Sequence, residues 1–536
     1  MILFGNLFIN FVAALQVYAM VVSGFSVTRS SSVCFIRSMK KYQRNKTLAY
    51  STSNAQVSND NVENCRMYRH QELMDASKLS LAPMMEYTDR HFRHLVRLIS
   101  SRTLLYTEMV AANALSHERR AVEEEYRSLN PNASIQKVKE NYSDQYLRRY
   151  LAQGRKDPLE GPSVLQLGGS DPAQMFEAAE TVMDMTARNW CNYTAINLNC
   201  GCPSPKVAGK GCFGAALMDD SNLVSELTQA LHDGTGGSLP ITVKCRIGTD
   251  SESPFTRSSY AEQDENKEYR RLCDFIETVA SNGIVTDFSV HARIAVLQKS
   301  FSPADNRKVP PLKYDTVRRL VIDYPEFTFT MNGGLESIEQ AQEQFSACPG
   351  LNGVMIGRAW AADPWRFSMA DKLLYGVDAT PTNRLQILQE YGKHADAEEK
   401  LGDPTKIRRF IVKAISPLFT SEPNAKRYRI ALDKIAGLPK QLAAHGKTIE
   451  GQPPLSELIL NVAYEHLSEE VLLRSPEESY DRLLSAANGR RSPISTGRER
   501  SRAVQEWQSQ RKTEALRDES FTGNATETQS TTTTVA

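Results

Sequence analysis

The sequence predicts an α/β chain: a (β/α)8 TIM barrel followed by a small all-α helical bundle, with disordered extensions at both ends. Two observations support this prediction. Between residues 78 and 376, eight short β-rich runs alternate with helical stretches, as in parallel strands joined by helices. From about residue 381 the pattern becomes purely helical. The alternative is an open doubly wound sheet, but no G-x-G-x-x-G turn follows the first run.

The predicted strands are short and apolar, and amphipathic segments such as Asp171–Ala187 and Ser221–His232 lie between them. In order, the strands are Leu79–Met84, Thr103–Glu108, Ser163–Leu167, Ala195–Leu198, Ile241–Arg246, Asp287–Val290, Thr328–Met331 and Gly353–Ile356. Two insertions, residues 118–160 and 250–268, follow the second and fifth strands. They therefore belong to the C-terminal face of the barrel, either as lids or, in the interpretation we favour, as surface decoration.

The helical domain is predicted over residues 381–475. Its amphipathic segments are Leu385–Ala395, Thr405–Leu418, Ala425–Leu438 and Leu455–Leu473. Basic residues recur along them, and no acid interrupts residues 406–413 or 426–429. A solvated helix face also explains such charges, but their density favours a surface for RNA. The residues predicted to bind the substrate there are Arg408, Arg409, Lys413, Arg427 and Arg429.

The two ends of the chain differ from its middle. Residues 1–77 are predicted to be a targeting leader and linker, and residues 485–536 a disordered tail. Residues 2–22 are apolar, and residues 23–59 are basic and serine-rich without an acid. This order resembles a bipartite plastid-targeting leader and predicts an organellar protein with no membrane segment in its mature form. The alternatives are a retained membrane anchor, a secretory signal, or a cytoplasmic protein whose start codon is misplaced.

Composition narrows the class of protein. A net charge of +1 and a hydrophobic content of 41% fit a globular protein whose basic surface would be local. Nine cysteines without a regular framework argue against a disulfide-stapled secreted domain. Cys191, Cys200, Cys202 and Cys212 lie near one another, but not in the paired spacing of zinc sites, so no metal is predicted.

Polar residues and glycines gather at the C-terminal ends of the predicted strands, which is the catalytic face of such barrels. Packing alone would scatter polar residues over both ends. In strand order, this ring consists of Pro83 and Met84, Gln166, Asn199, Lys244 and Arg246, His291 and Arg293, Asn332 with Gly333 and Gly334, and Gly357 with Arg358.

The loops after strands seven and eight predict a phosphate site. Glycine lets backbone N–H groups approach an anion, and Arg358 adds a charge-assisted contact. A phosphate there, with Lys244 at the barrel mouth, suits flavin mononucleotide (FMN), because a nearby cation stabilises the reduced anionic flavin. Lys244 also fits a Schiff-base lysine or a structural ion pair, and His291 also fits a buried packing histidine.

Cys202 follows the fourth strand in the segment Asn199–Pro205, with the sequence NCGCPSP. Its glycine, serine and prolines predict a tight loop that presents a thiol over the barrel mouth. A thiol in that position acts as a nucleophile or as a general acid. Cys200 and Cys212 are predicted to be packing thiols.

Several long motifs, in order along residues 79 to about 440, resemble those of the tRNA-dihydrouridine synthase family. They are Leu81–Met85, Tyr87–Arg90, Leu165–Pro172, Ile196–Ser204, Gly211–Met218, Val243–Gly248 and Asn332–Gly334. A second set resembles the dihydrouridine synthase A subfamily specifically. It consists of Val290–Arg293, Leu297, Ser302 with Pro303, Asn306 with Arg307, and Pro310–Leu312.

This resemblance implies an FMN-dependent enzyme that uses NADPH to reduce the C5–C6 double bond of uridine in tRNA. The subfamily implies D-loop positions 20 and 20a. Cys202 is the implied catalytic proton donor, and Asn199, Arg246 and Arg293 are expected to contact the substrate. The implied FMN contacts are Pro83, Met84, Gln166, Lys244, His291, Asn332, Gly333, Gly334, Gly357 and Arg358. No stable protein partner is implied, and a monomer is expected.

The chain departs from the family pattern at Ile294, where the family usually has lysine, and at Cys200 and Cys212. Three other functions remain open. They are a flavin enzyme acting on a free pyrimidine or enone, a Schiff-base lyase using Lys244, and a tRNA-binding protein without catalysis.

Overall fold

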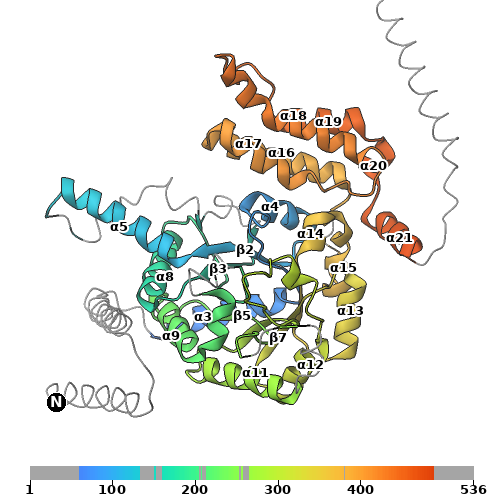
Figure 1. The fold of residues 1–536 in the computed structure, drawn as a ribbon. Coiled ribbons are helices and arrows are strands. Elements are labelled where there is room, and N and C mark those ends of the chain that lie inside the picture. The colour runs from blue at the N-terminus through green and yellow to red at the C-terminus, as the bar shows by residue number, and fades with distance from the viewer. Residues whose placement is uncertain are drawn as a thin grey trace, which may run out of the picture. The chain divides into compact units, whose positions relative to one another are not determined.

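The structure is a computed structural model, and it describes residues 59–132, 134, 150–151, 160–204, 207, 213–252, 255–256, 265–378 and 381–487. Eight parallel strands close into a barrel in sequence order, which confirms the predicted TIM barrel (Figure 1). The strands are β1 (Leu79–Leu81), β2 (Leu104–Ala111), β3 (Ser163–Gly168), β4 (Ala195–Cys200), β5 (Ile241–Arg246), β6 (Asp287–His291), β7 (Thr328–Asn332) and β8 (Gly353–Ile356).

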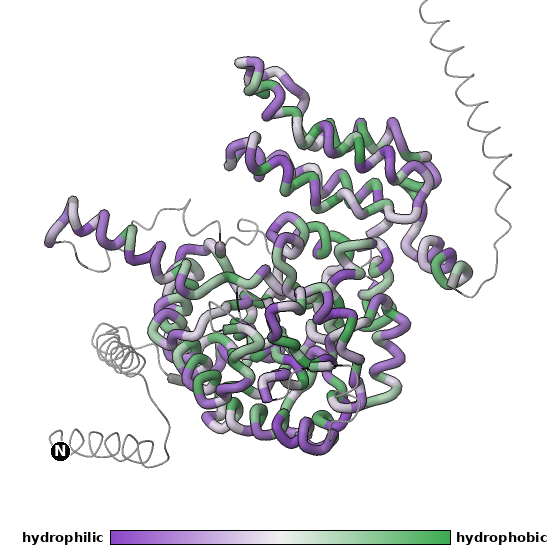
Figure 2. The backbone as a smooth tube through the Cα atoms, in the orientation of Figure 1, coloured by the Kyte–Doolittle hydropathy of each residue, from purple (hydrophilic) through white to green (hydrophobic). Residues whose placement is uncertain are grey.

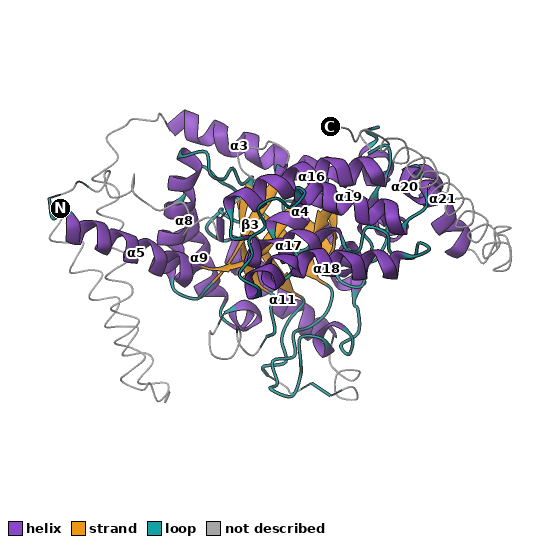
Figure 3. Ribbon diagram, turned by 90° about the horizontal axis from the view of Figure 1, so that it is seen from above, coloured by secondary structure: helices purple, strands orange, loops and turns teal. Residues whose placement is uncertain are grey.

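Helices lie outside the strands, and the view from above shows the strands enclosed by them (Figure 3). The longer helices of the barrel are α4 (Arg90–Ile99), α5 (Ala112–Leu129), α8 (Pro172–Ala187), α9 (Ser221–Gly234), α11 (Glu265–Ala280), α12 (Tyr314–Asp323) and α13 (Ile338–Ala347). Two shorter ones, α14 (Arg358–Ala362) and α15 (Ala370–Tyr375), follow β8. Most of both predicted insertions, residues 118–160 and 250–268, lies outside the described residues.

The strands are buried on both faces, which explains why they are continuously apolar instead of alternating. Ile196 and Leu198 of β4, like Val243 of β5, have no exposed surface. Figure 2 shows hydrophobic residues recurring in the interior and hydrophilic residues along the outer helices. Because all eight strands run in the same direction, their C-terminal ends meet at one face of the barrel.

Helix α3 (Asn59–Ala76) lies in the segment predicted to be leader and linker. Its Arg69 donates a hydrogen bond of 2.6 Å to the carbonyl of Tyr193, which precedes β4. Leu73 and Ala76 are buried in a core cluster with barrel residues. Helix α3 therefore packs against the N-terminal ends of the strands and belongs to the folded barrel. Residues 1–58, which hold the predicted leader sequence, lie outside the described residues.

The C-terminal part is helical, as predicted. It contains α16 (Arg384–Leu401), α17 (Pro404–Ile415), α18 (Ala425–Ala444), α19 (Leu455–His466), α20 (Glu469–Leu473) and a last helix, α21 (Pro476–Ala487). Helix α21 reaches into the predicted disordered tail, and residues 488–536 lie outside the described residues. Within the described residues, no helix is both long and apolar enough to cross a bilayer, and the apolar run of residues 2–22 lies outside them.

Helix α4 of the barrel joins the helical domain through side-chain contacts. Arg90 donates from Nε and from one terminal nitrogen to Oε2 of Glu398 on α16, at 2.9 and 2.8 Å. Nδ1 of His91 lies 3.0 Å from Nε2 of His394 on α16. Nζ of Lys413 on α17 donates to the carbonyl of Glu86 at 2.6 Å. The helical domain is thus fixed next to the loop between β1 and α4.

Candidate functional site

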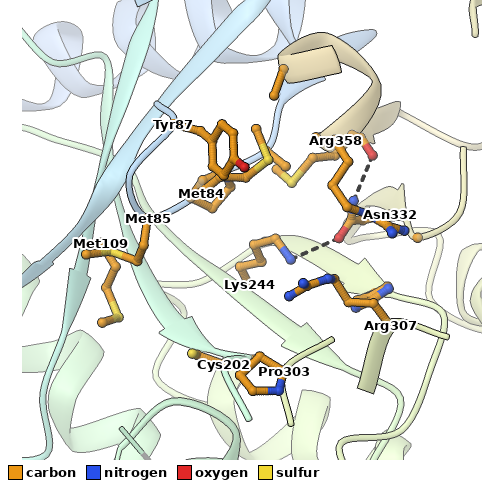
Figure 4. A pocket seen from close by; sticks show the side chains of 18 of the residues that line it. Met84, Met85, Tyr87, Met109, Cys202, Lys244, Pro303, Arg307, Asn332 and Arg358 are labelled. Atoms are coloured by element: carbon orange, nitrogen blue, oxygen red, sulfur yellow. Dashed lines mark hydrogen bonds between the residues drawn. The ribbon is translucent and has the colours of Figure 1, made fainter. Parts of the chain in front are cut away.

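A cavity of about 730 Å³ opens at the C-terminal ends of the strands (Figure 4). Each strand, or the loop that follows it, contributes to its lining, as shown by Pro83, Met109, Gln166, Asn199, Lys244, His291, Asn332 and Met355. Its volume falls within the range of pockets that hold cofactors. The ring of residues predicted at the strand ends is therefore brought together in one cavity, with the exception of Arg293.

The loop that carries Cys202 is fixed by its neighbours. Oδ1 of Asn199 accepts hydrogen bonds from the backbone N–H groups of Gly201 and Cys202, at 2.9 and 3.1 Å. This is a side-chain turn of the kind that asparagine makes in tight loops. Nε of Arg246 donates to the carbonyl of Gly201 at 2.9 Å. Cys202 therefore lies in the cavity wall on a loop that is bonded at both peptide groups beside Gly201.

A chain of buried amides orients Asn199. Its Nδ2 donates to Oε1 of Gln166 at 3.0 Å, and Nε2 of Gln166 donates to Oδ1 of Asn197 at 2.9 Å. Nδ2 of Asn197 donates to the Thr242 hydroxyl at 2.8 Å. Since buried amide groups need hydrogen-bond partners, this chain fixes which atom of Asn199 faces the Cys202 loop.

Lys244 projects into the middle of the cavity, where its Nζ donates to Oδ1 of Asn332 at 3.1 Å (Figure 4). Burial lowers the pKa of Lys244 to about 8, and the nearby Arg246 adds to this effect. Burial likewise lowers the pKa of Arg246 to about 9. Burial, followed by the charges of Arg246 and Lys244, holds the pKa of His291 well below its usual value, so its imidazole is neutral at pH 7.

Positive charge predominates in the cavity. The described lining residues include four side chains that are predominantly cationic at pH 7 and a single carboxylate, Glu336. The cations are Lys244, Arg246, Arg307 and Arg358. Such an excess suits an anionic ligand such as a phosphate.

The loop after β7 requires glycine. Gly333 has φ of +117°, and a Cβ atom there would lie 2.4 Å from Cδ2 of His291. Gly334 has φ of +71°, and a Cβ atom there would lie 2.5 Å from Cδ1 of Leu312. The Tyr314 hydroxyl donates to the carbonyl of Gly333 at 2.7 Å. A side chain at either position would clash with His291 or Leu312, so both positions need glycine. As lining residues without side chains, the two glycines present their backbone to the cavity.

Two predicted substrate residues lie elsewhere. Arg408 is only 1% exposed and forms an ion pair with Glu399, with one contact of 2.8 Å. A buried, paired guanidinium does not reach an RNA phosphate, so the structure removes Arg408 from the predicted basic surface. Arg293 is buried outside the cavity lining and donates to the carbonyl of Pro310 at 3.0 Å. Its contact supports the segment after β6 and does not reach the substrate cavity.

The other predicted basic residues are exposed on α17 and α18. They are Arg409, Lys413, Arg427 and Arg429. Lys413 also touches the rim of the cavity, because its ammonium lies 5.0 Å from the ring centroid of Tyr87, a lining residue.

Sequence reasoning overlooked Arg307, Tyr87, Met109 and Pro303 as lining residues. Arg307 belongs to a short helical turn, Asp305–Arg307, which is distant along the sequence from the end of β6 at His291. The buried Asn306 holds this turn in place by exchanging two hydrogen bonds with the backbone of Val296, at 2.8 and 2.9 Å. The presence of Arg307 and Tyr87 in the matched motifs was the available signal.

Two of the departures from the family pattern, Ile294 and Cys200, lie outside the cavity lining. Ile294 is buried, and its carbonyl accepts a hydrogen bond of 2.8 Å from Arg246. Cys200 is buried in β4, and Cys212 lies outside the described residues. The described part of the chain brings together no group of three or more His, Cys, Asp or Glu side chains suited to a metal ion.

Comparison with known proteins gives a consistent result. The family model described as dihydrouridine synthase matches residues 80–450. A tRNA-dihydrouridine(20/20a) synthase of Salmonella typhi is 35% identical over 363 residues, which cover 68% of this chain and 91% of that protein. The enzyme of the same name from Synechocystis sp. is 36% identical over 354 residues, covering 66% of this chain and 88% of that protein. The chain therefore belongs to the dihydrouridine synthase family.

Proposed function

We propose that this chain is an FMN- and NADPH-dependent oxidoreductase that reduces uridine to 5,6-dihydrouridine at positions 20 and 20a of tRNA. The observation that carries the proposal is the cavity at the barrel mouth, which combines an excess of positive charge, a glycine-bounded loop and the fixed thiol of Cys202. Family membership and the names of the relatives support the same reaction.

The residues around the cavity fit FMN. Arg358 and the open backbone at Gly333 and Gly334 would hold the phosphate, and Lys244 would lie against the flavin ring. Gln166, His291 and Asn332 supply further polar groups in the cavity lining. When bound, FMN supplies the hydride that reaches C6 of the uracil ring.

Cys202 would donate the proton that C5 needs after hydride addition. In Figure 4 this thiol lies on the opposite side of the cavity from Met84 and Tyr87. It can therefore face a uracil ring that enters the space between Cys202 and these two side chains. A thiol retains a proton near neutral pH, whereas an ordinary carboxylic acid is ionised there. Arg246 and Asn199 hold the loop, so the thiol is placed before the substrate arrives.

The exposed basic residues of α17 and α18 would hold the tRNA through its phosphates. The target uridine lies in a stacked RNA and the thiol lies in a cavity, so the base would leave its stack to react. A free pyrimidine would need no such basic surface, which is why we favour tRNA as the substrate.

Purified protein tests the proposal. The chain should retain FMN and, with NADPH, form dihydrouridine at positions 20 and 20a of an unmodified tRNA transcript. Uridine monophosphate in place of the transcript should react far more slowly. Absence of dihydrouridine from an FMN-loaded protein supplied with NADPH would contradict the proposed function. Equal reaction of the nucleotide would favour an enzyme for free pyrimidines.

We also propose that the enzyme acts on organellar tRNA, on the strength of the apolar and basic runs in residues 1–77. Since α3 begins at Asn59 and contacts the barrel through Arg69, a cleaved leader would end before Asn59. A fluorescent protein fused behind residues 1–58 should enter the organelle. Retention of this fusion in the cytosol would reject the organellar proposal.

A further inference from the structure

We infer that Tyr87 is a stacking residue for the nucleobase that flanks the target uridine. Glu108 and Lys413 are positioning residues that hold the Tyr87 ring at the cavity mouth. The inference rests on the proposed function and adds a substrate contact to it.

Tyr87 is unusual among the aromatic side chains of the barrel. Its ring lines the cavity and is nevertheless 50% exposed, whereas Tyr106 and Tyr193 are buried. In Figure 4 it lies beside Met84, across the cavity from Cys202. Proteins that bind single-stranded or looped RNA use such accessible rings as platforms on which bases stack. A half-exposed ring at the rim would meet the nucleotide next to the one that enters the cavity.

The backbone that presents this ring is strained and doubly held. Glu86, directly before Tyr87, has φ of +67°, a left-handed conformation that a residue with a side chain rarely adopts. Its N–H donates to the carboxylate of Glu108 on β2, and its carbonyl accepts from Nζ of Lys413 at 2.6 Å. Strained conformations of this kind persist at functional sites where the surrounding structure holds them.

Lys413 connects the ring to the helical domain. The same ammonium that binds the Glu86 carbonyl lies 5.0 Å from the Tyr87 ring centroid, within the range of a cation–π interaction. Arg409, exposed one turn earlier on α17, is available for a phosphate. An RNA strand held by α17 would therefore pass directly beside the Tyr87 ring.

Three variants of the FMN-loaded full chain test the stacking role. Tyr87→Leu keeps an apolar side chain but removes the ring, and it should raise the KM for tRNA by roughly tenfold or more, as loss of one base–aromatic stack does. Its FMN content and its oxidation of NADPH without tRNA should change far less. Tyr87→Phe should restore most of the tRNA reaction. Tyr68→Leu is the matched control, because Tyr68 is an exposed tyrosine on α3.

Three results would overturn the stacking role. One is a wild-type KM in Tyr87→Leu. Another is loss of FMN in parallel with activity, which would make Tyr87 a wall of the cofactor site. The last is a Tyr87→Phe variant as impaired as Tyr87→Leu, which would assign the effect to the hydroxyl.

A double-mutant cycle tests the positioning role of Lys413. Lys413→Met should impair the tRNA reaction in the wild-type background and have a smaller effect in the Tyr87→Leu background, because residues that act together are not additive. Arg409→Met should have the same effect in both backgrounds. Equal effects of Lys413→Met in both backgrounds would overturn the positioning role.

The proposed function and this inference fail in different ways. If the wild-type chain makes no dihydrouridine, both the proposed function and the stacking role of Tyr87 are contradicted. An active wild type whose Tyr87→Leu variant is equally active removes only the stacking role.

Discussion

At the scale of single residues, the placement of Cys202 depends on side chains that lie on neighbouring strands. Asn199 accepts from the N–H groups of Gly201 and Cys202, and Arg246 binds the carbonyl of Gly201. These hydrogen bonds restrict the conformation of the Cys202 loop before any substrate binds. The thiol can therefore act on a bound base without reorganisation of the protein.

Cys202→Ala tests the role of the thiol. The variant should lose dihydrouridine formation by roughly 100-fold or more, which is the usual contribution of a general acid. Its FMN content and its oxidation of NADPH without tRNA should stay close to those of the wild type, because the thiol is needed only for the uracil ring. Single-turnover formation of dihydrouridine, measured beside NADPH oxidation, separates the two steps. A fully active variant would exclude Cys202 as proton donor.

Lys244 predicts a pH dependence of FMN binding. In the flavin-free protein, burial lowers its pKa to about 8, so its ammonium is present below that pH and lost above it. Binding of an anionic cofactor favours the ammonium, so above about pH 8 binding must take up a proton. The affinity for FMN should then fall as pH rises, by up to about tenfold per pH unit.

Fluorescence titration of the apoprotein with FMN between about pH 7 and pH 9.5 measures this slope. In Lys244→Met the affinity should be lower at pH 7 and should change less with pH. An unchanged slope in that variant would show that another group titrates.

Residue-level prediction from the sequence succeeded where a residue's position along a strand decides its direction. The cavity gathers Gln166, Lys244 and His291 because each lies in the C-terminal half of a strand of a closed parallel barrel. The same argument did not predict Arg307 as a lining residue, because Arg307 enters the cavity from a turn held by Asn306 and not from a strand. Arg293 ends outside the cavity, since a strand-end position does not fix the direction of a side chain in the following loop.

At the scale of elements, helix α17 shows that the number of basic residues in a helix does not determine how many of them are exposed. Successive residues of a helix point about 100° apart, so neighbouring basic residues face different surroundings. Arg408 is buried against Glu399, whereas Arg409 is exposed. The number of basic residues predicted a basic surface, but only the packed structure shows which of them form it.

Arg408→Ala and Arg409→Ala should therefore have different effects. Removal of Arg408 leaves the Glu399 carboxylate unpaired and should destabilise the protein by about 3–5 kcal/mol, as broken buried ion pairs do. Removal of Arg409 should leave thermal stability unchanged and weaken tRNA binding, with a smaller dependence on salt. Denaturant unfolding and tRNA titrations at two salt concentrations compare the pair. Equal loss of stability in both variants would contradict this assignment.

At the scale of the whole molecule, the barrel followed by helices was predictable because its periodic elements repeat. Helix α3 was not, since residues 59–76 are largely polar and follow a run of targeting composition. Its packing depends on contacts such as Arg69 with the Tyr193 carbonyl, which join residues 124 positions apart. The strand boundaries also differ by a few residues from those predicted: β1 ends at Leu81, before the loop that contains Pro83, and not at Met84.

The junction of the barrel with the helical domain contains three packed histidines, His91 and His94 on α4 and His394 on α16. Burial, then the charges of His94 and Arg90, lowers the pKa of His394 to about 2, and burial lowers that of His91 well below its usual value. His91 and His394 are therefore neutral in the folded protein and take up protons when it unfolds below about pH 6.5.

Stability should therefore fall as the pH decreases below about 6.5, with His394 alone contributing about 2 kcal/mol of loss by pH 5. Denaturant unfolding at pH 7 and pH 5 measures the difference. His394→Gln, which stays neutral, should show a smaller loss between the two values. The same loss in the variant would show that His394 does not titrate on unfolding.

The central claim is that this chain makes dihydrouridine in tRNA and that Cys202 supplies the proton. Single-nucleotide mapping of dihydrouridine in each compartment of cells that lack the gene, with wild type or Cys202→Ala restored, tests it most directly. The account predicts loss of dihydrouridine at positions 20 and 20a of one tRNA pool, recovery with the wild-type chain, and no recovery with the variant. Unchanged dihydrouridine in every compartment, or full recovery with Cys202→Ala, would contradict it.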